Sequence, residues 1–129
     1  MPLYTVSTGL SLTVPRRKEL ANLIMEVHCG ITGAPKTFVN VLYCENVPLA
    51  DGITMNVLGT VRKGRTSAMN DTLQKELIQK ISDLMKISDL QLELSLFEVP
   101  AQWVMEGGEI LPEPGEEDQC EWLQKGHSA

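Results

Sequence analysis

The first fifty residues carry a period-two apolar pattern, then a helical one, then a second strand-like stretch. Residues 3–8 and 37–44 are rich in β-branched and aromatic residues, which is typical of β-strands. Between them, apolar residues recur at helical spacing, after a proline suited to a first helical turn and before a glycine that marks the end: Pro15, then Leu20, Leu23, Ile24, Val27 and Ile31, then Gly33. The pattern predicts a strand, a helix and a second strand.

The same order of patterns then repeats. Residues 53–62 alternate apolar and polar positions, with Met55, Val57 and Val61 set against Thr54, Asn56, Thr60 and Arg62. Residues 66–86 carry one apolar helix face, formed by Met69, Leu73, Leu77, Ile81 and Leu84. Residues 90–99 alternate again, with leucine at 90, 92, 94 and 96. The second half therefore predicts a strand, a helix and a fourth strand.

These elements define an α+β fold of two consecutive β-α-β units, at about residues 2–50 and 51–100. Right-handed crossovers make the strands of each unit parallel, and both helices should cover one face of a four-stranded sheet. Residues 101–129 change to glycine, proline and acidic residues, with weak helical periodicity in the last dozen. We interpret them as an extension that packs locally or on a neighbouring subunit, so residues 1–129 form one domain.

Composition narrows the possible functions. The net charge is −6, which argues against nucleic-acid binding, because phosphate affinity needs clustered cations. No apolar stretch is long enough for a membrane span and no secretory signal is visible, so we expect a cytoplasmic protein. The cysteines, Cys29, Cys44 and Cys120, have no C-x-x-C spacing, and the histidines, His28 and His127, share no ligand spacing. No metal or organic cofactor is indicated.

The stretch GTVRKGRT (59–66) allows three interpretations. It differs from a phosphate-binding P-loop by Arg65 in place of lysine, and Gly59 falls inside the alternation of a strand instead of opening a loop. Alternatively, Arg62 at a strand end and Arg65 at a helix start could hold a small carboxylate, with help from the helix amides. Both arginines could also be solvated surface residues.

The chain begins MPLY, which raises a separate possibility. Methionine is normally trimmed before a residue as small as proline, and its loss would leave Pro2 as a secondary amine at the head of a strand. An α-amino group titrates at a pKa of about 7.7–8.0, and burial or nearby cations lower that value. Such an amine can act as a general acid or base. A retained Met1, or a proline of no special role, is the alternative.

Four segments in order resemble the tautomerase superfamily, in the branch of cis-3-chloroacrylic acid dehalogenase. They are MPLYT at the start, HCGITGAPK (28–36), RKGRT (62–66), and FEVP (97–100) followed by MEGGEILPEPGEE (105–117). The resemblance covers roughly residues 2–118. It implies two β-α-β units in one chain, an amino-terminal proline as catalytic acid or base, and a homotrimer.

Carried over by position, the resemblance implies a role for each of five residues. Pro2 would be the catalytic amine, with Arg65 helping to set its pKa. Arg62 and Arg65 would bind the substrate carboxylate, and His28 would bind substrate. Glu106 would activate water for attack on an unsaturated acid.

One residue that differs from the family bears on the proposed activation of water. The dehalogenases carry a tyrosine where this chain has Ser95, and a serine hydroxyl is shorter and much less acidic. Keto–enol tautomerisation of a small 2-oxo acid is therefore the leading expectation. Weak hydration or dehalogenation of an unsaturated acid is second. The alternative from another class is a binding or structural subunit with little turnover, and the large Trp103 near Glu106 is expected to shape the pocket.

Overall fold

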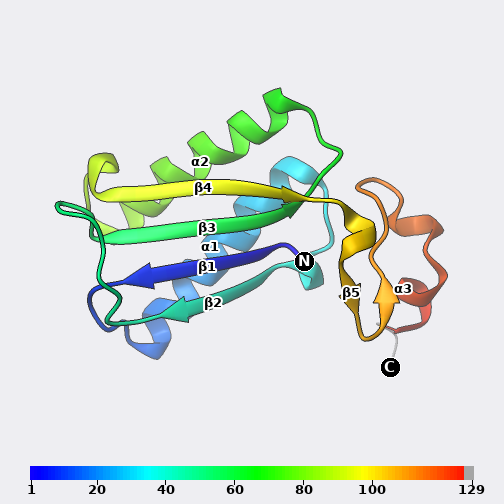
Figure 1. The fold of residues 1–129 in the computed structure, drawn as a ribbon, viewed down its shortest axis with the longest axis horizontal. Coiled ribbons are helices and arrows are strands. Elements are labelled where there is room, and N and C mark those ends of the chain that lie inside the picture. Colours follow the sequence, from blue (N-terminus) through cyan, green and yellow to red (C-terminus); the bar gives the residue numbers. More distant parts are fainter. Residues whose placement is uncertain (127–129) are drawn as a thin grey trace.

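The computed structural model describes residues 1–126 and places a four-stranded sheet in front of two long helices (Figure 1). The strands are ordered β2-β1-β3-β4 across the sheet. The main elements are β1 (Leu3–Thr8), α1 (Val14–Thr32), β2 (Asn40–Cys44), β3 (Met55–Arg62), α2 (Ser67–Met85) and β4 (Leu92–Val99).

Strand directions confirm the two predicted β-α-β units. β1 runs parallel to β2, and β3 runs parallel to β4, with one helix in each crossover. The two units meet through β1 and β3, which are antiparallel and pair Tyr4 with Gly59. Both long helices lie on the same side of the sheet (Figure 1), so neither of them covers the opposite face.

Both helices begin and end where the sequence supplies capping groups. The hydroxyl of Thr13 accepts the Arg16 amide at the start of α1, and the hydroxyl of Thr66 accepts the Met69 amide at the start of α2. α1 ends at Gly33, whose φ of 75° is left-handed and places its amide on the Cys29 carbonyl. Because Thr66 caps α2, Arg65, the residue before it, lies at the N-terminus of that helix.

The main core lies between the sheet and the helices and matches the predicted apolar faces. It is built from alternate strand residues and from one stripe of each helix: Tyr4, Val6, Met55, Val57, Val61, Leu92 and Leu94 from the sheet, and Leu20, Ile24, Val27, Leu73, Leu77 and Ile81 from the helices. Burial of these side chains is the main stabilising contribution to the fold.

Three details of the sequence interpretation were wrong. The second strand begins at Asn40, because residues 36–38 form a 3₁₀ turn that buries Phe38. Leu90 is 83% exposed, because it lies in the 3₁₀ turn Asp89–Gln91 that Ser88 caps, before β4 begins. Arg62, which one interpretation treated as a solvated surface residue, is only 1% exposed.

The extension folds as a small unit beside the ends of the sheet, close to the N-terminus (Figure 1). It contains the hairpin β5 (Met105–Glu106) and β6 (Glu109–Ile110) and the short helix α3 (Glu121–Gly126). A second apolar cluster joins it to the rest of this chain: Met1, Phe38, Ala101, Leu111 and Leu123. Local packing, one of the two expected arrangements, is thus observed within the chain.

None of the helices in the described part of the chain is both long and apolar enough to cross a bilayer.

Candidate active site

The amino terminus, the ends of β3 and β4 and the extension meet at one edge of the sheet. The Met1 amine forms an ion pair with the Glu106 carboxylate, although the two residues are 105 positions apart in the sequence. Met1 is almost fully buried in the second cluster, and Pro2 is buried beside it. The Pro2 carbonyl accepts the Asn40 amide at 3.0 Å. The first two residues are therefore held in place by β2 and the extension.

A surface hollow of about 340 Å³ opens at this position. Its lining comes from the chain start, from β2, β3 and from the extension: Met1, Leu3, Asn40, Thr60, Val104 and Glu106. A small acid of a few carbon atoms would fit a hollow of this size. Glu106 is the one acidic side chain in the lining.

Arg62 is buried, and both of its terminal nitrogens are hydrogen-bonded, whereas its Nε has no partner in the described part of the chain. Its Nη1 donates to the Pro112 carbonyl at 2.7 Å, and its Nη2 donates to Glu117 Oε1 at 2.7 Å. The guanidinium also stacks 5.2 Å from the centre of the Phe38 ring. Burial raises the pKa of Glu117, but the hydrogen bond and charge of Arg62 and backbone amides bring it below its ordinary value. Arg62 thus ties the end of β3 to the extension.

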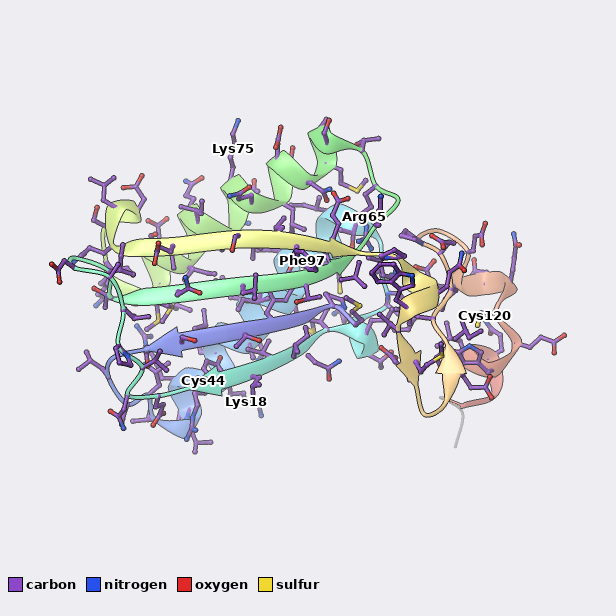
Figure 2. All side chains as sticks on the ribbon, viewed as in Figure 1. Lys18, Cys44, Arg65, Lys75, Phe97 and Cys120 are labelled. Atoms are coloured by element: carbon purple, nitrogen blue, oxygen red, sulfur yellow. The ribbon has the colours of Figure 1, made fainter. Side chains whose placement is uncertain are left out.

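Arg65 is the less constrained arginine of the pair. Its Nη1 donates to the Arg62 carbonyl at 3.3 Å, and it forms no ion pair with a carboxylate within residues 1–126. Burial, and then the charge of Arg62, lower its pKa. It lines a hollow of about 270 Å³ with Thr66 and Pro114, where β3 leads into α2 (Figure 2). The α2 amino terminus adds partial positive charge there.

His28 is fully buried and belongs to a hydrogen-bonded pair. The Tyr4 hydroxyl lies 2.8 Å from His28 Nδ1, and the two rings meet edge to face. Burial lowers the pKa of His28 to about 3, with further lowering from the charges of Arg65, Arg62 and the amino terminus. His28 is therefore neutral at physiological pH, and it lies within electrostatic range of three positive groups.

The structure thus places all five predicted site residues at one end of the molecule, but not all in direct contact. Met1 is joined to the Pro2 nitrogen by a peptide bond, and the Met1 amine, not Pro2, pairs with Glu106. Ser95 is exposed on the uncovered face of the sheet, opposite Leu58. Trp103 is exposed as well, two residues before β5. His127 lies outside the described residues. Within those residues, no group of three or more potential metal ligands is found.

Sequence reasoning missed two residues of this site. Tyr4 was interpreted only as part of the first strand, although it is the partner of His28. Glu117 was one acid among many in the extension, although it is the carboxylate on Arg62. The proximity of MPLY to a buried histidine could not be read from spacing, because the contact crosses from a strand to a helix.

The position of Gly59 shows how the stretch GTVRKGRT is arranged. It lies in the middle of β3, opposite Tyr4 on one side and Leu96 on the other. Only residues 63–66 separate β3 from α2. The stretch therefore does not form the glycine-rich loop that a P-loop requires.

Comparisons with known proteins agree with this architecture. The family model described as "Putative oxalocrotonate tautomerase enzyme" matches residues 1–127. Among solved structures, N1, a member of the cis-3-chloroacrylic acid dehalogenase family, is 26% identical, with a TM-score of 0.87 over 98% of this chain and 99% of N1. No curated protein sequence gives a significant match.

Two more distant structures share the fold. Pt0534, solved after inactivation by 2-oxo-3-pentynoate, is 21% identical, with a TM-score of 0.74 over 84% of this chain and 96% of Pt0534. A fused 4-OT solved as a symmetric trimer is 20% identical, with a TM-score of 0.74 over 85% of this chain and 95% of that chain.

The fold and the family match together define the class: the chain belongs to the tautomerase superfamily. Within it, the chain falls in the branch that resembles cis-3-chloroacrylic acid dehalogenase.

Proposed function

We propose that this protein is a cofactor-independent proton-transfer enzyme that acts on small 2-oxo or unsaturated carboxylates with Pro2 as its acid–base group. One observation carries the proposal: the amino terminus is buried beside the Glu106 carboxylate, and its charge acts on His28 together with those of Arg65 and Arg62. Burial of a charged amine is costly, so a chain end that is buried beside an acidic side chain points to a functional role.

Removal of Met1 is the step that would create the active form. In the full chain the Pro2 nitrogen is an amide with no useful basicity. Loss of Met1 would make it a secondary amine and would empty the buried space that the Met1 side chain fills among Phe38, Ala101 and Leu111. Burial and the two arginines would lower the pKa of this amine, so that a neutral fraction exists at physiological pH.

The preferred reaction is keto–enol tautomerisation. The neutral Pro2 nitrogen takes a proton from C3 of a 2-oxo acid, and electrons move to the 2-oxo oxygen to form the enolate. The Pro2 ammonium then gives its proton to the enolate oxygen, which forms the enol. Arg65 binds the substrate carboxylate, and Arg62, whose fork is occupied by its own chain, contributes its positive charge. His28 binds an oxygen of the substrate.

Hydration or dehalogenation of an unsaturated acid is a secondary activity in this proposal. Glu106 would activate the water, since it lines the hollow beside the chain start. Ser95 supplies no phenol hydroxyl to assist it, so we expect the rate of water addition to be low. The competing proposal, a tautomerase-fold binding subunit with little turnover, applies if Met1 is retained.

Arg65→Ala tests the substrate site. We expect kcat/KM for C3 proton exchange of 2-oxobutanoate in D₂O, followed by proton NMR on Met1-free protein, to fall by about 10- to 100-fold. Loss of one charged hydrogen bond costs about 1.5–3 kcal/mol, which corresponds to this range. The reason is that Arg62, the other arginine at the site, already uses both terminal nitrogens in hydrogen bonds within the chain.

Lys63→Ala is the matched control for this experiment. Lys63 is an exposed cation two residues away in the same turn, so general loss of charge would affect both variants alike. Exchange that falls equally in both variants, or in neither, would contradict a specific role for Arg65.

We also propose a homotrimer, supported by the uncovered sheet face. Leucine and phenylalanine side chains are exposed on that face from all four strands: Leu3, Leu42, Leu58 and Phe97. Exposed apolar side chains that recur across one sheet face are typical of an interaction surface, and a fused 4-OT relative is a symmetric trimer. We expect sedimentation equilibrium to give the mass of three 14.3 kDa chains and Phe97→Glu to lower it; a monomeric wild-type protein would refute the trimer.

A further inference from the structure

Gly59 provides space for the ring of Tyr4. The two residues are directly opposite in the antiparallel pair of β1 and β3. A Cβ atom at position 59 would lie 2.6 Å from Tyr4 Cε1 and 2.9 Å from Leu96 Cδ2. Both distances are shorter than non-bonded carbon atoms tolerate. Glycine inside a strand commonly marks such a close approach, so Gly59 lets the Tyr4 ring lie flat over β3 and reach α1.

Tyr4 reaches a single partner with its hydroxyl. The oxygen lies 2.8 Å from His28 Nδ1, and Tyr4 and His28 are both 0% exposed. No other hydrogen-bond partner for this hydroxyl is found within residues 1–126. If Nδ1 carried the proton, the tyrosine O–H would be buried without an acceptor, which is costly. The hydroxyl therefore donates to Nδ1, and the proton of the neutral imidazole resides on Nε2.

His28 Nε2 is a buried donor without a partner. It makes no hydrogen bond in the described part of the chain. The positive charges of Arg65, Arg62 and the amino terminus act on the ring and, after burial, lower its pKa. An unpaired buried donor in a positive environment suits one kind of ligand atom, namely an oxygen of an anionic acid.

We propose that Tyr4 is a positioning residue that holds His28 in its neutral Nε2–H tautomer, so that Nε2–H donates to an oxygen of the bound acid. Gly59 is the second component, because it sets where the Tyr4 hydroxyl lies. This inference rests on the proposed function for the identity of the ligand. Either the carboxylate oxygen or the 2-oxo oxygen of that acid can accept a hydrogen bond from this donor.

Nitrogen-15 NMR of the imidazole tests the proposal on Met1-free protein. His127→Gln leaves one histidine, so the spectrum reports His28 alone. We expect a pyridine-type Nδ1 and a pyrrole-type Nε2, and we expect 2-oxobutanoate to shift the Nε2 proton. Tyr4→Phe should give a mixture of tautomers and weaken 2-oxobutanoate binding by about 5- to 10-fold, as for the loss of one hydrogen bond worth about 1 kcal/mol.

Tyr43→Phe is the matched control, because it removes the other tyrosine hydroxyl of the chain, which donates to the Arg17 carbonyl. It should leave the tautomer and binding unchanged. Gly59→Ala provides a second disturbance, which shifts Tyr4 without removing its hydroxyl and should also give mixed tautomers. A pyrrole-type Nδ1 in the wild type, or an unchanged tautomer in Tyr4→Phe, would overturn the proposal.

The same data separate this inference from the proposed enzyme. If 2-oxobutanoate shifts Nε2 but its C3 protons do not exchange, the positioning role stands and the enzymatic proposal fails. If the protons exchange while Nε2 is unaffected by the ligand, the enzyme stands and the role of Tyr4 and His28 is refuted.

Discussion

Protein that has lost Met1 should catalyse C3 proton exchange of 2-oxobutanoate, and protein that keeps Met1 should not. The difference should be at least about 10²-fold, the lower end of what a positioned acid–base group contributes. The physical reason is that Met1 acylates the Pro2 nitrogen, occupies the adjacent buried space and pairs its own amine with Glu106. The comparison uses one protein before and after treatment with methionine aminopeptidase, with intact mass to confirm the product.

Pro2→Ala gives the complementary control. Alanine also permits removal of Met1 but leaves a primary amine on an unconstrained residue, so binding and assembly should persist while exchange is lost. Equal exchange by the Met1-retaining and Met1-free forms would mean that the base lies elsewhere.

Arg62→Ala should produce the largest loss of stability among the site variants. Removal of one partner of a buried ion pair costs about 3–5 kcal/mol, and we expect about 3 kcal/mol here because Glu117 retains some solvent contact. The variant also loses the contact with Phe38 and the hydrogen bond to Pro112. The free energy of unfolding from urea titration measures the change.

Two further variants test whether the pair itself is responsible. Arg62→Met combined with Glu117→Gln leaves no unpaired charge and should recover part of the loss, while Lys63→Ala, on the exposed side of the turn, should cost under about 0.5 kcal/mol. An Arg62→Ala variant as stable as Lys63→Ala would contradict the buried ion pair.

The contribution of Glu117 to the free energy of unfolding should decrease as the pH falls. Its pKa in the folded protein is below its ordinary value because of Arg62 and backbone amides, so the unfolded state binds more protons between the two values. The stabilisation is therefore complete above the ordinary glutamate pKa of about 4.3 and is lost as pH falls through the lowered value. The gap in unfolding free energy between wild type and Glu117→Gln should narrow over that interval.

The fold was predictable because each local sequence signal favours the same element that the structure contains at that position. Capping residues Thr13 and Thr66, alternating strands and helical stripes each specify a local structure, and right-handed crossovers leave few ways to connect them. The starts of β2 and β4 were less predictable. Phe38 and Leu90 have high strand or apolar character, but 3₁₀ turns take both residues out of the sheet.

The candidate site was predictable only as a set of residue types. Pro2, Arg62 and Arg65 were candidates from their own chemistry and positions. His28 and Glu106 followed only from family resemblance, and the partners of all five depend on contacts between distant segments. Glu117 is 55 positions from Arg62, and Glu106 is 105 positions from the amine that it pairs with. No periodicity encodes such pairs. The burial of Arg62 could not be read from alternation, because the last residue of β3 is covered by the extension and not by a helix.

The most direct test of an activated Pro2 is covalent labelling by an acetylenic 2-oxo acid. Protein freed of Met1 would be incubated with 2-oxo-3-pentynoate, and the adduct mapped by mass spectrometry. The Pro2 nitrogen would add to the triple bond and the proton would pass to the neighbouring carbon, so the mass should rise by one whole reagent. We predict a single adduct on Pro2 that Arg65→Ala slows. No adduct, or an adduct elsewhere on a chain with a free Pro2, would contradict the account.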